Sequence, residues 1–239
     1  MGRIFMVRHG QASFLARDYD KLSPIGEAQA RLLGEYWARH HTAFDQICSG
    51  PRLRQKDTAS IACEACRNAG HALPDPVVVD EFDEYQGDAV LEQSLPGLLA
   101  CDAGIRELHR ALQGAQNPAE QRKSFQRLFA TVIGRWVNGE IPLPDVESWP
   151  AFCNRVNRGL STILSARGRG QQVAIFSSAG PVAAAMQRAL NLSPQDTLRS
   201  AWMVRNCSYT EFLCSSERFT LSTFNACPHL EDAAMLTYR

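Results

Sequence analysis

The chain has 239 residues, of which 45% are hydrophobic and 21% charged, and its 25 lysines and arginines are balanced by 25 aspartates and glutamates. These are ordinary globular values, so the composition excludes a largely disordered chain and allows a sizeable buried core. Because the charge is balanced and no basic block occurs, we expect neither nucleic acid nor an anionic membrane as a partner.

Four short apolar runs predict buried strands, because continuous apolar runs are typical of strands covered on both faces. They lie at residues 3–7, 45–48, 77–79 and 173–176. The first helix is expected from Pro24 to about His41, with Ser23 as its N-cap. Helical spacing predicts a buried face made of Ile25, Ala28, Leu32 and Tyr36. Further helices are expected at 53–65 and 148–167 and from Pro181 onward.

The alternation of strands and helices predicts an α/β fold with three layers, α/β/α, around a mostly parallel sheet. Residues 208–214 and 218–224 flank a short polar turn and are expected to form an antiparallel hairpin at the sheet edge. Residues 85–147 have helical patterns and no strand, so we predict a helical cap insertion over one end of the sheet. We expect a single domain, residues 1–239, that carries this insertion.

The N-terminal residues and the cysteines indicate the compartment. The chain lacks the regions of a signal peptide, and no apolar run approaches the ~20 residues of a membrane span, so we expect a cytoplasmic protein. Eight cysteines without a secretory signal favour reduced thiols. Cys63 and Cys66 form a CxxC inside a helical pattern, where helix packing is a better explanation than a zinc or redox site.

Polar side chains follow each of the four predicted strands. Arg8 and His9 follow the first, Arg54 lies just after the second, Glu81 follows the third, and the turn at 177–181 follows the fourth. In open α/β sheets, ligands bind outside the carboxyl ends of the strands. Two guanidinium groups and a helix N-terminus are well suited to a doubly charged tetrahedral oxyanion. The sequence therefore predicts a phosphate site.

These residues also carry a family resemblance. The segments "VRHGQ" (7–11), "SGPRLRQKDTA" (49–59) and "EFDEY" (81–85) resemble the signature segments of the histidine phosphatase superfamily, which includes the cofactor-dependent phosphoglycerate mutases. The resemblance runs from residue 2 to about 81, resumes near residue 147 and again at 173–186, and is weak in the insertion. The first two segments are specific together, because their order, spacing and strand context all agree.

The resemblance implies a role for each matching residue. His9 is the nucleophile that becomes a phosphohistidine, and Arg8 and Arg54 hold the phosphate oxygens. Arg54 is the match because Thr58 follows four residues later, whereas Arg52 falls on a position that is usually apolar. The phosphate-binding set implied in this way is Arg8, Gly10, Arg54, Ser178 and Ala179.

A carboxylic acid is also implied, as the proton donor to the leaving oxygen. Glu81 matches that position, and Glu84 is the alternative because the match is loose there. Such a carboxyl must be protonated near neutral pH, and a bound phosphate beside it favours the protonated form.

One position departs from the family pattern. Members usually read Ser-His-Gly-Gly where this chain has Ser-Ser-Ala-Gly, so Ser178 stands in place of the second pocket histidine. A bacterial branch with serine there has a C-terminal segment similar to residues 224–239. Loss of one charge-assisted hydrogen bond costs roughly 1.5 to 3 kcal/mol, which slows a phosphatase without forbidding it. The Ser178 hydroxyl is one possible substitute, and His229 is another, although a structural role is expected for His229.

These observations predict a phosphatase that hydrolyses a small phosphomonoester through phospho-His9, with no cofactor and no metal. The alternative is a phospho-ligand-binding protein with little or no turnover, because Ser178 replaces the second histidine. A phosphoglycerate mutase-type phosphotransferase is the third candidate, and it would need a pocket for a second acceptor that the sequence does not reveal. The physiological substrate and the oligomeric state stay open.

Overall fold

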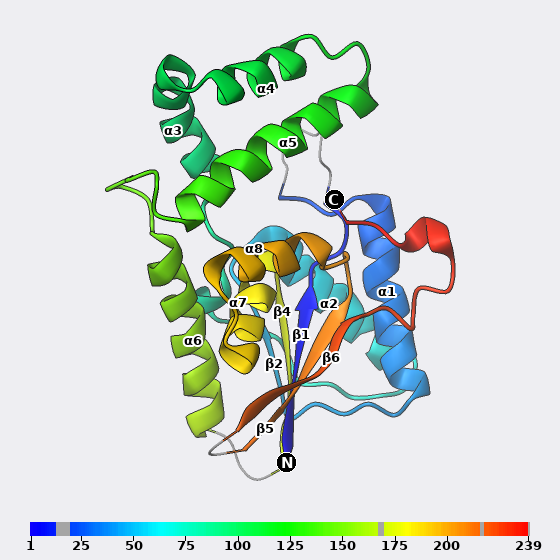
Figure 1. Cartoon of the computed structure of the whole chain (residues 1–239). Coiled ribbons are helices and arrows are strands. Elements are labelled where there is room, and N and C mark those ends of the chain that lie inside the picture. The colour runs from blue at the N-terminus through cyan, green and yellow to red at the C-terminus, as the bar shows by residue number, and fades with distance from the viewer. Residues whose placement is uncertain (13–19, 167–169, 216–217, 239) are drawn as a thin grey trace. The chain divides into compact units, whose positions relative to one another are not determined.

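The computed structural model describes residues 1–12, 20–166, 170–215 and 218–238. Six strands in this part of the chain form one sheet in the order β3-β2-β4-β1-β5-β6 (Figure 1). They are β1 (Gly2–Arg8), β2 (Gln46–Ser49), β3 (Val77–Val78), β4 (Gln172–Ser177), β5 (Tyr209–Cys214) and β6 (Phe219–Ala226). The first four are parallel, whereas β5 runs antiparallel to β1 and forms the predicted edge hairpin with β6.

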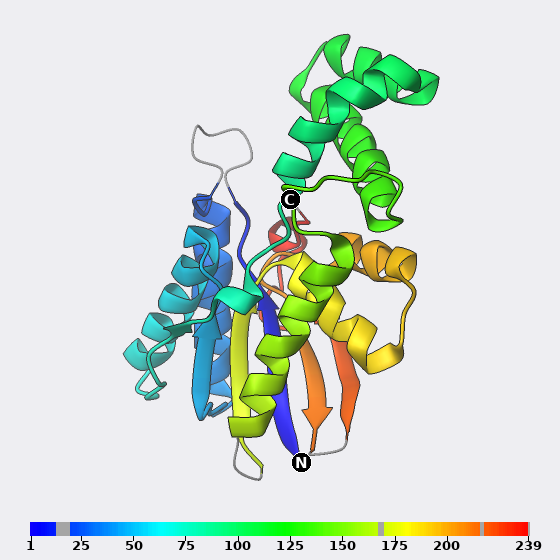
Figure 2. The same cartoon turned by 90° about the vertical axis from the view of Figure 1, so that its left-hand side faces the viewer.

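The helices in the described residues are α1 (Pro24–Arg39), α2 (Leu53–Asn68), α3 (Gly87–Cys101), α4 (Ala103–Gln113), α5 (Pro118–Val137), α6 (Trp149–Ala166), α7 (Ala179–Leu190) and α8 (Pro194–Met203). Helices α1 and α2 cover one face of the sheet, and α6 and α7 cover the other (Figure 1, Figure 2). The predicted three-layer α/β/α fold around a mostly parallel sheet is therefore confirmed.

The central strands are buried on both faces, as their continuous apolar runs predict. Phe5 and Val7 of β1 pack in one core cluster with Phe176 of β4 and with Trp37 of α1. The alternate residues of β1, Ile4 and Met6, are fully buried as well. Because two covered faces leave a strand no freedom to slip by one residue, the register of β1 and β4 is fixed, with Arg8 opposite Ser177.

Two predictions about buried faces are wrong. Helix α1 buries Ala30, Leu33 and Trp37, while Ile25 is exposed and Ala28, Leu32 and Tyr36 are only partly covered. Helix α2 approaches closely at Gly34, so the face of α1 that carries Gly34 is the one that packs against α2. Residues 77–79 are not a buried strand either, because β3 is a two-residue edge strand and Val77 and Val78 are exposed.

Helix α7 begins two residues earlier than predicted. Its first residue is Ala179 and its N-cap is Ser178, so Pro181 lies within the first turn instead of starting the helix. Proline is tolerated there because the N–H groups of the first turn have no acceptor inside the helix. The consequence is that the helix N-terminus lies immediately after β4.

Residues Tyr85–Phe152 form a compact unit of their own, separate from the unit made of Met1–Glu84 and Cys153–Arg239. The smaller unit holds α3, α4 and α5 and the first residues of α6. Its core contains the aromatic group of Tyr85, Trp136 and Trp149, in which the two indole rings are 5.7 Å apart. Both tryptophans therefore have a packing role, and the single-domain interpretation stays a prediction.

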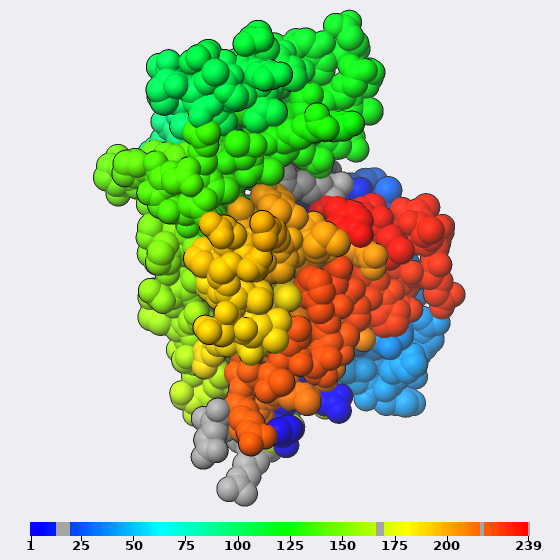
Figure 3. Space-filling model, viewed as in Figure 1, coloured from blue at the N-terminus to red at the C-terminus, as the bar shows by residue number. Residues whose placement is uncertain are grey.

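The segment that follows β6 lies on the surface beside α1 (Figure 3, red). The Gln29 amide of α1 donates to the Met235 carbonyl at 2.7 Å and to the Thr237 hydroxyl at 3.0 Å. The Thr237 carbonyl in turn accepts from the Asn206 N–H at 2.8 Å. These bonds connect the C-terminal segment to the loop that precedes β5.

The described residues contain neither a membrane-spanning helix nor a disulfide. No helix among them is long and apolar enough to cross the lipid bilayer. All eight cysteines lie in the described part of the chain, and all are free thiols. Cys63 and Cys66 are buried in α2, as expected of residues with a packing role.

Candidate active site

The ends of β1 and β4 bring the first group of predicted site residues together. Arg8 ends β1 opposite Ser177, and the His9 N–H donates to the Ser177 carbonyl at 2.8 Å. The His9 carbonyl accepts from the Cys207 N–H at 3.1 Å and from the Asn206 amide at 3.3 Å. The backbone of the histidine is therefore held by the end of β4 and by the loop that precedes β5, and its side chain is almost fully buried.

Hydrogen bonds define the state of the His9 ring. Nδ1 lies 2.7 Å from the Gly10 carbonyl, which can only accept, so Nδ1 carries the proton. Nε2 accepts from Arg54 Nε at 3.1 Å. The imidazole is consequently neutral, with the lone pair of Nε2 directed at a guanidinium group. This is the form in which an imidazole acts as a nucleophile.

Gly10 has a different role from the phosphate contact that was expected. Its N–H donates to Thr58 Oγ1 at 3.0 Å, and its carbonyl holds His9 Nδ1. A Cβ at this position would clash with the backbone carbonyl of Gly26 in α1. Gly10 therefore allows close contact with α1 and orients the imidazole, and its N–H is not available for an anion.

Arg54 is fixed by a carboxylate that the sequence did not single out. Its Nη1 donates to Asp20 Oδ1 at 2.7 Å, and Asp20 Oδ2 accepts from the Leu53 N–H at 2.8 Å. Asp20 thus binds the first turn of α2 and the guanidinium at once, where negative charge is favoured by the helix N-terminus. Arg8 is equally buried, and its Nη1 donates to the Val204 carbonyl.

The N-terminus of α7 lies at the end of β4. Among the residues that the structure describes, none accepts the N–H of Ala179, the first residue of the helix. The next N–H, that of Gly180, donates to Glu84 Oε2 at 3.2 Å. An N–H at a helix N-terminus is a suitable partner of an anion, and the phosphate-binding role of Ala179 stays a prediction.

Ser178 lies below this surface. It is fully buried, and its hydroxyl accepts from Gln55 Nε2 at 2.8 Å. The amide orientation of Gln55 is fixed, because its Oε1 accepts from the Arg52 N–H at 3.1 Å. A phosphate oxygen has no access to a fully buried hydroxyl, so the structure does not support the expected contact between Ser178 and phosphate.

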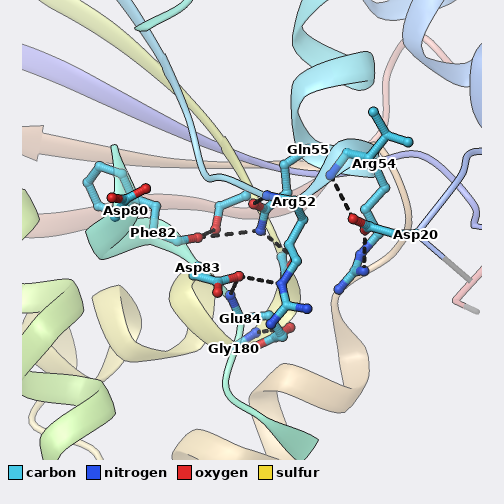
Figure 4. A network of polar contacts seen from close by, with 12 residues as sticks. Asp20, Arg52, Arg54, Gln55, Asp80, Phe82, Asp83, Glu84 and Gly180 are labelled. Carbon is cyan, nitrogen blue, oxygen red and sulfur yellow. Dashed lines mark hydrogen bonds and ion pairs between the residues drawn. The ribbon is translucent and has the colours of Figure 1, made fainter. Parts of the chain in front are cut away.

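The two candidate acids lie in different surroundings. Residues Asp80–Phe82 form a 3₁₀ turn in which the Glu81 Cβ packs against Gly159 of α6. The chain then extends at Asp83, and the carboxylate of Glu84 reaches the N-terminus of α7 (Figure 4). No described residue forms a hydrogen bond or ion pair with the Glu81 carboxylate. The geometry thus favours Glu84, the alternative, over Glu81.

Arg52 adds a third guanidinium group to the same region. Its Nε donates to Asp83 Oδ1 at 2.6 Å, and that oxygen also accepts from the Glu84 N–H at 2.7 Å. Figure 4 shows the Arg52 side chain extending from the start of α2 toward Asp83. The second cation was expected from Arg54 alone, because Arg52 occupies a position that is usually apolar.

Sequence reasoning missed Asp20, Gln55 and Asp83. Each of them acts by orienting another side chain, and no motif spacing marks such a role. Arg52 and Asp83 could have been found from the sequence. Arg52 is a charged residue at a position that is usually apolar, and Asp83 is an acidic residue in the segment at 81–85, which could pair with it. His229 is buried next to Tyr36 of α1, with ring centroids 6.2 Å apart.

The described residues contain no group of three or more histidine, cysteine, aspartate or glutamate side chains that could hold a metal ion. Among the described residues, the charged groups of the site are Arg8, Arg52, Arg54, Asp20, Asp83 and Glu84. Cations in this arrangement can bind an oxyanion next to the imidazole without a metal.

Solved structures from several organisms share this fold. YhfR of Bacillus stearothermophilus has a TM-score of 0.66 at 16% identity, covering 97% of this chain and 100% of that one. A putative α-ribazole-5'-P phosphatase of Escherichia coli has a TM-score of 0.63 at 18% identity, with 94% and 96% covered. The mycobacterial glucosyl-3-phosphoglycerate phosphatase, solved with VO3, has a TM-score of 0.60 at 18% identity, with 95% and 100% covered.

Among curated proteins, the mouse ubiquitin-associated and SH3 domain-containing protein B is 24% identical over 208 residues. The match covers 84% of this chain but only 28% of that protein. Residues 4–88 and 88–227 match the histidine phosphatase superfamily (branch 1), and this range includes His9, Arg8, Arg52, Arg54 and the turn after β4. The chain belongs to the histidine phosphatase superfamily.

Proposed function

We propose that this protein is a phosphatase that hydrolyses a small phosphomonoester through a phosphohistidine intermediate on His9. The observation that carries the proposal is the state of the imidazole, in which Nδ1 is held by the Gly10 carbonyl and Nε2 accepts from Arg54. Phosphatases such as the mycobacterial enzyme share the fold, which supports this class of reaction.

The reaction proceeds in two transfers. His9 Nε2 attacks phosphorus, the bond from phosphorus to the ester oxygen breaks, and a carboxylic acid gives its proton to the leaving alkoxide. Water then attacks the phosphohistidine, the carboxylate takes a proton from that water, and phosphate leaves while His9 is restored. Arg8, Arg54 and the Ala179 N–H stabilise the charge on the three equatorial oxygens.

We assign the acid to Glu84, because its carboxylate lies at the N-terminus of α7 whereas Glu81 packs against α6. Glu84→Gln should slow hydrolysis of alkyl phosphates by about 100-fold and of p-nitrophenyl phosphate much less, because a good leaving group needs no proton. Glu81→Gln is the matched control. Equal losses for both ester types, or a larger loss with Glu81→Gln, would contradict the assignment.

The central experiment compares the parent with His9→Ala on p-nitrophenyl phosphate, followed by a base quench that preserves phosphohistidine. We expect an acid-labile, base-stable phosphoenzyme in the parent and a rate loss of at least about 1,000-fold in the variant. A variant that hydrolyses as fast as the parent would show that His9 is not the nucleophile.

A second candidate is a phospho-ligand-binding protein with little or no turnover. The observation that favours it is the burial of Ser178, whose hydroxyl is engaged with Gln55 and gives the phosphoryl group no donor. Thermal stabilisation by phosphate without hydrolysis across a broad panel of phosphomonoesters would support this candidate. Hydrolysis that depends on His9 would exclude it.

A further inference from the structure

Among the residues that the structure describes, the partner of the Arg52 guanidinium is bound through one of its three nitrogens. Nε donates to Asp83 Oδ1 at 2.6 Å, while neither terminal nitrogen donates to a residue in the described ranges. The Arg52 side chain is 37% exposed, in contrast to Arg8 and Arg54, which are each 7% exposed as whole residues. The outermost arginine of the group therefore presents two amino groups in a fixed orientation.

The surrounding carboxylates hold this guanidinium in place. Burial alone lowers the pKa of Arg52, but the hydrogen bond to Asp83 and the charges of Asp83, Asp20 and Glu84 outweigh it, so the pKa lies above its ordinary value. Each of these carboxylates is engaged by donors other than the terminal nitrogens of Arg52. The N–H groups that have no acceptor among the described residues point to an additional acceptor from outside the protein.

The difference in depth decides what that acceptor is. His9, Arg8 and Arg54 are nearly inaccessible and form the inner part of the site, where the phosphoryl group binds according to the proposed function. The organic part of a phosphomonoester then extends outward, to the exposed region in which Arg52 lies two residues before Arg54. Two amino groups of one guanidinium match the two oxygens of a carboxylate or phosphate.

We propose that Arg52 is a specificity-determining residue that binds a second oxyanion on the leaving group of the substrate. This inference rests on the proposed phosphatase function and names its substrate class: phosphomonoesters of small molecules that carry a further carboxylate or phosphate. Asp83 is a positioning residue, because it fixes the Arg52 guanidinium through Nε.

The test uses three substrates that differ only in the second group: 2-phosphoglycolate with a carboxylate, ethane-1,2-diol bisphosphate with a phosphate, and ethyl phosphate with neither. In the parent, we expect a lower KM for at least one acidic substrate than for ethyl phosphate. Arg52→Ala should raise the KM of that substrate about 10- to 100-fold and change ethyl phosphate less than about threefold. The acidic substrate whose KM rises more in Arg52→Ala identifies the second group as carboxylate or phosphate.

Two further variants separate recognition from folding. Arg52→Lys keeps the charge but loses the paired donors, so its KM should lie between those of the parent and Arg52→Ala. Arg67→Ala removes another α2 arginine with a carboxylate partner, Asp75, and should leave all three substrates unchanged. Equal effects of Arg52→Ala on all three substrates, or a parent with no preference for either acidic substrate, would overturn the inference while leaving His9-dependent hydrolysis intact.

Binding keeps the inference testable if the protein does not hydrolyse phosphomonoesters. Phosphonoacetate and ethylphosphonate resist hydrolysis and differ in the carboxylate. Calorimetric titration should show that the parent prefers phosphonoacetate and that Arg52→Ala loses the preference. Equal affinity of the parent and Arg52→Ala for phosphonoacetate would refute a carboxylate contact even when the phosphatase proposal itself has failed.

Discussion

Replacement of His229 should remove a measurable part of the acid sensitivity of this protein. His229 is 2% exposed, and neither ring nitrogen meets the distance and angle of a regular hydrogen bond with a described residue, although the Cys207 backbone lies close. Burial lowers the pKa of His229 from 6.5 to about 4, and the Cys207 backbone offsets only part of this effect. The native state therefore excludes a proton that the unfolded chain accepts below pH 6.5.

The direction and size of the pH effect on the free energy of unfolding follow from this difference in proton binding. As the pH falls from 6.5 toward 4, the unfolded state binds more protons than the native state, so the free energy of unfolding decreases. The slope is about 1.4 kcal/mol per pH unit, which gives a loss of about 2 kcal/mol at pH 5 and about 3 kcal/mol at pH 4. This contribution is fully present above pH 6.5.

Urea unfolding at pH 7 and pH 5 measures the effect. His229→Leu fills a similar volume without a titratable group, so its stability should fall by about 2 kcal/mol less than that of the parent between the two pH values. His40→Gln, which alters an exposed histidine, is the control and should behave like the parent. An equal pH dependence in the parent and His229→Leu would refute the reasoning, because it would mean that the buried ring titrates normally.

Other predictions concern the site and the thiols. Asp20→Asn leaves one acceptor oxygen for two donors, the Arg54 guanidinium and the Leu53 N–H. We therefore expect kcat/KM to fall about 10-fold and the free energy of unfolding to fall by about 1 kcal/mol. An unchanged rate would contradict the positioning role of Asp20. Gly10→Ala places a methyl group against the Gly26 carbonyl. Urea unfolding should show a loss of about 1 to 3 kcal/mol in the free energy of unfolding, and most activity should be lost as well. The control is Gly97→Ala, whose methyl group meets open space and should not destabilise the protein. Cys101 is exposed, whereas burial raises the pKa of Cys48 to about 11 and of Cys63 to about 12. Iodoacetamide at pH 8 should therefore modify Cys101 before these two thiols, and mass spectrometry of the digested protein measures the order.

The sequence alone located the inner part of the site. Arg8 and His9 end a strand that is buried on both faces, and the register of such a strand cannot change without moving its apolar residues into the wrong environment. The position of the imidazole relative to the end of β4 was therefore predictable from patterning. That Arg54 lies near His9 was predictable from the same order of strands and helices, because α2 begins just after β2.

The outer part of the site depended on side-chain directions that no pattern specifies. Glu81 and Glu84 are three residues apart, and only the 3₁₀ turn followed by an extended residue decides which one reaches the N-terminus of α7. Ser178 was expected to face phosphate, but its hydroxyl lies below the surface with Gln55.

The fold class and the placement of Arg8 and His9 at the end of a buried strand were determined by the amino-acid sequence by itself, because burial and chain connectivity act over a few neighbouring residues at a time. Only the tertiary structure decided that Asp20 orients Arg54, that Asp83 orients Arg52, and which helix face is buried in α1. These outcomes depend on contacts between segments far apart in the chain, where a single loop or a small residue such as Gly34 changes which side chains meet.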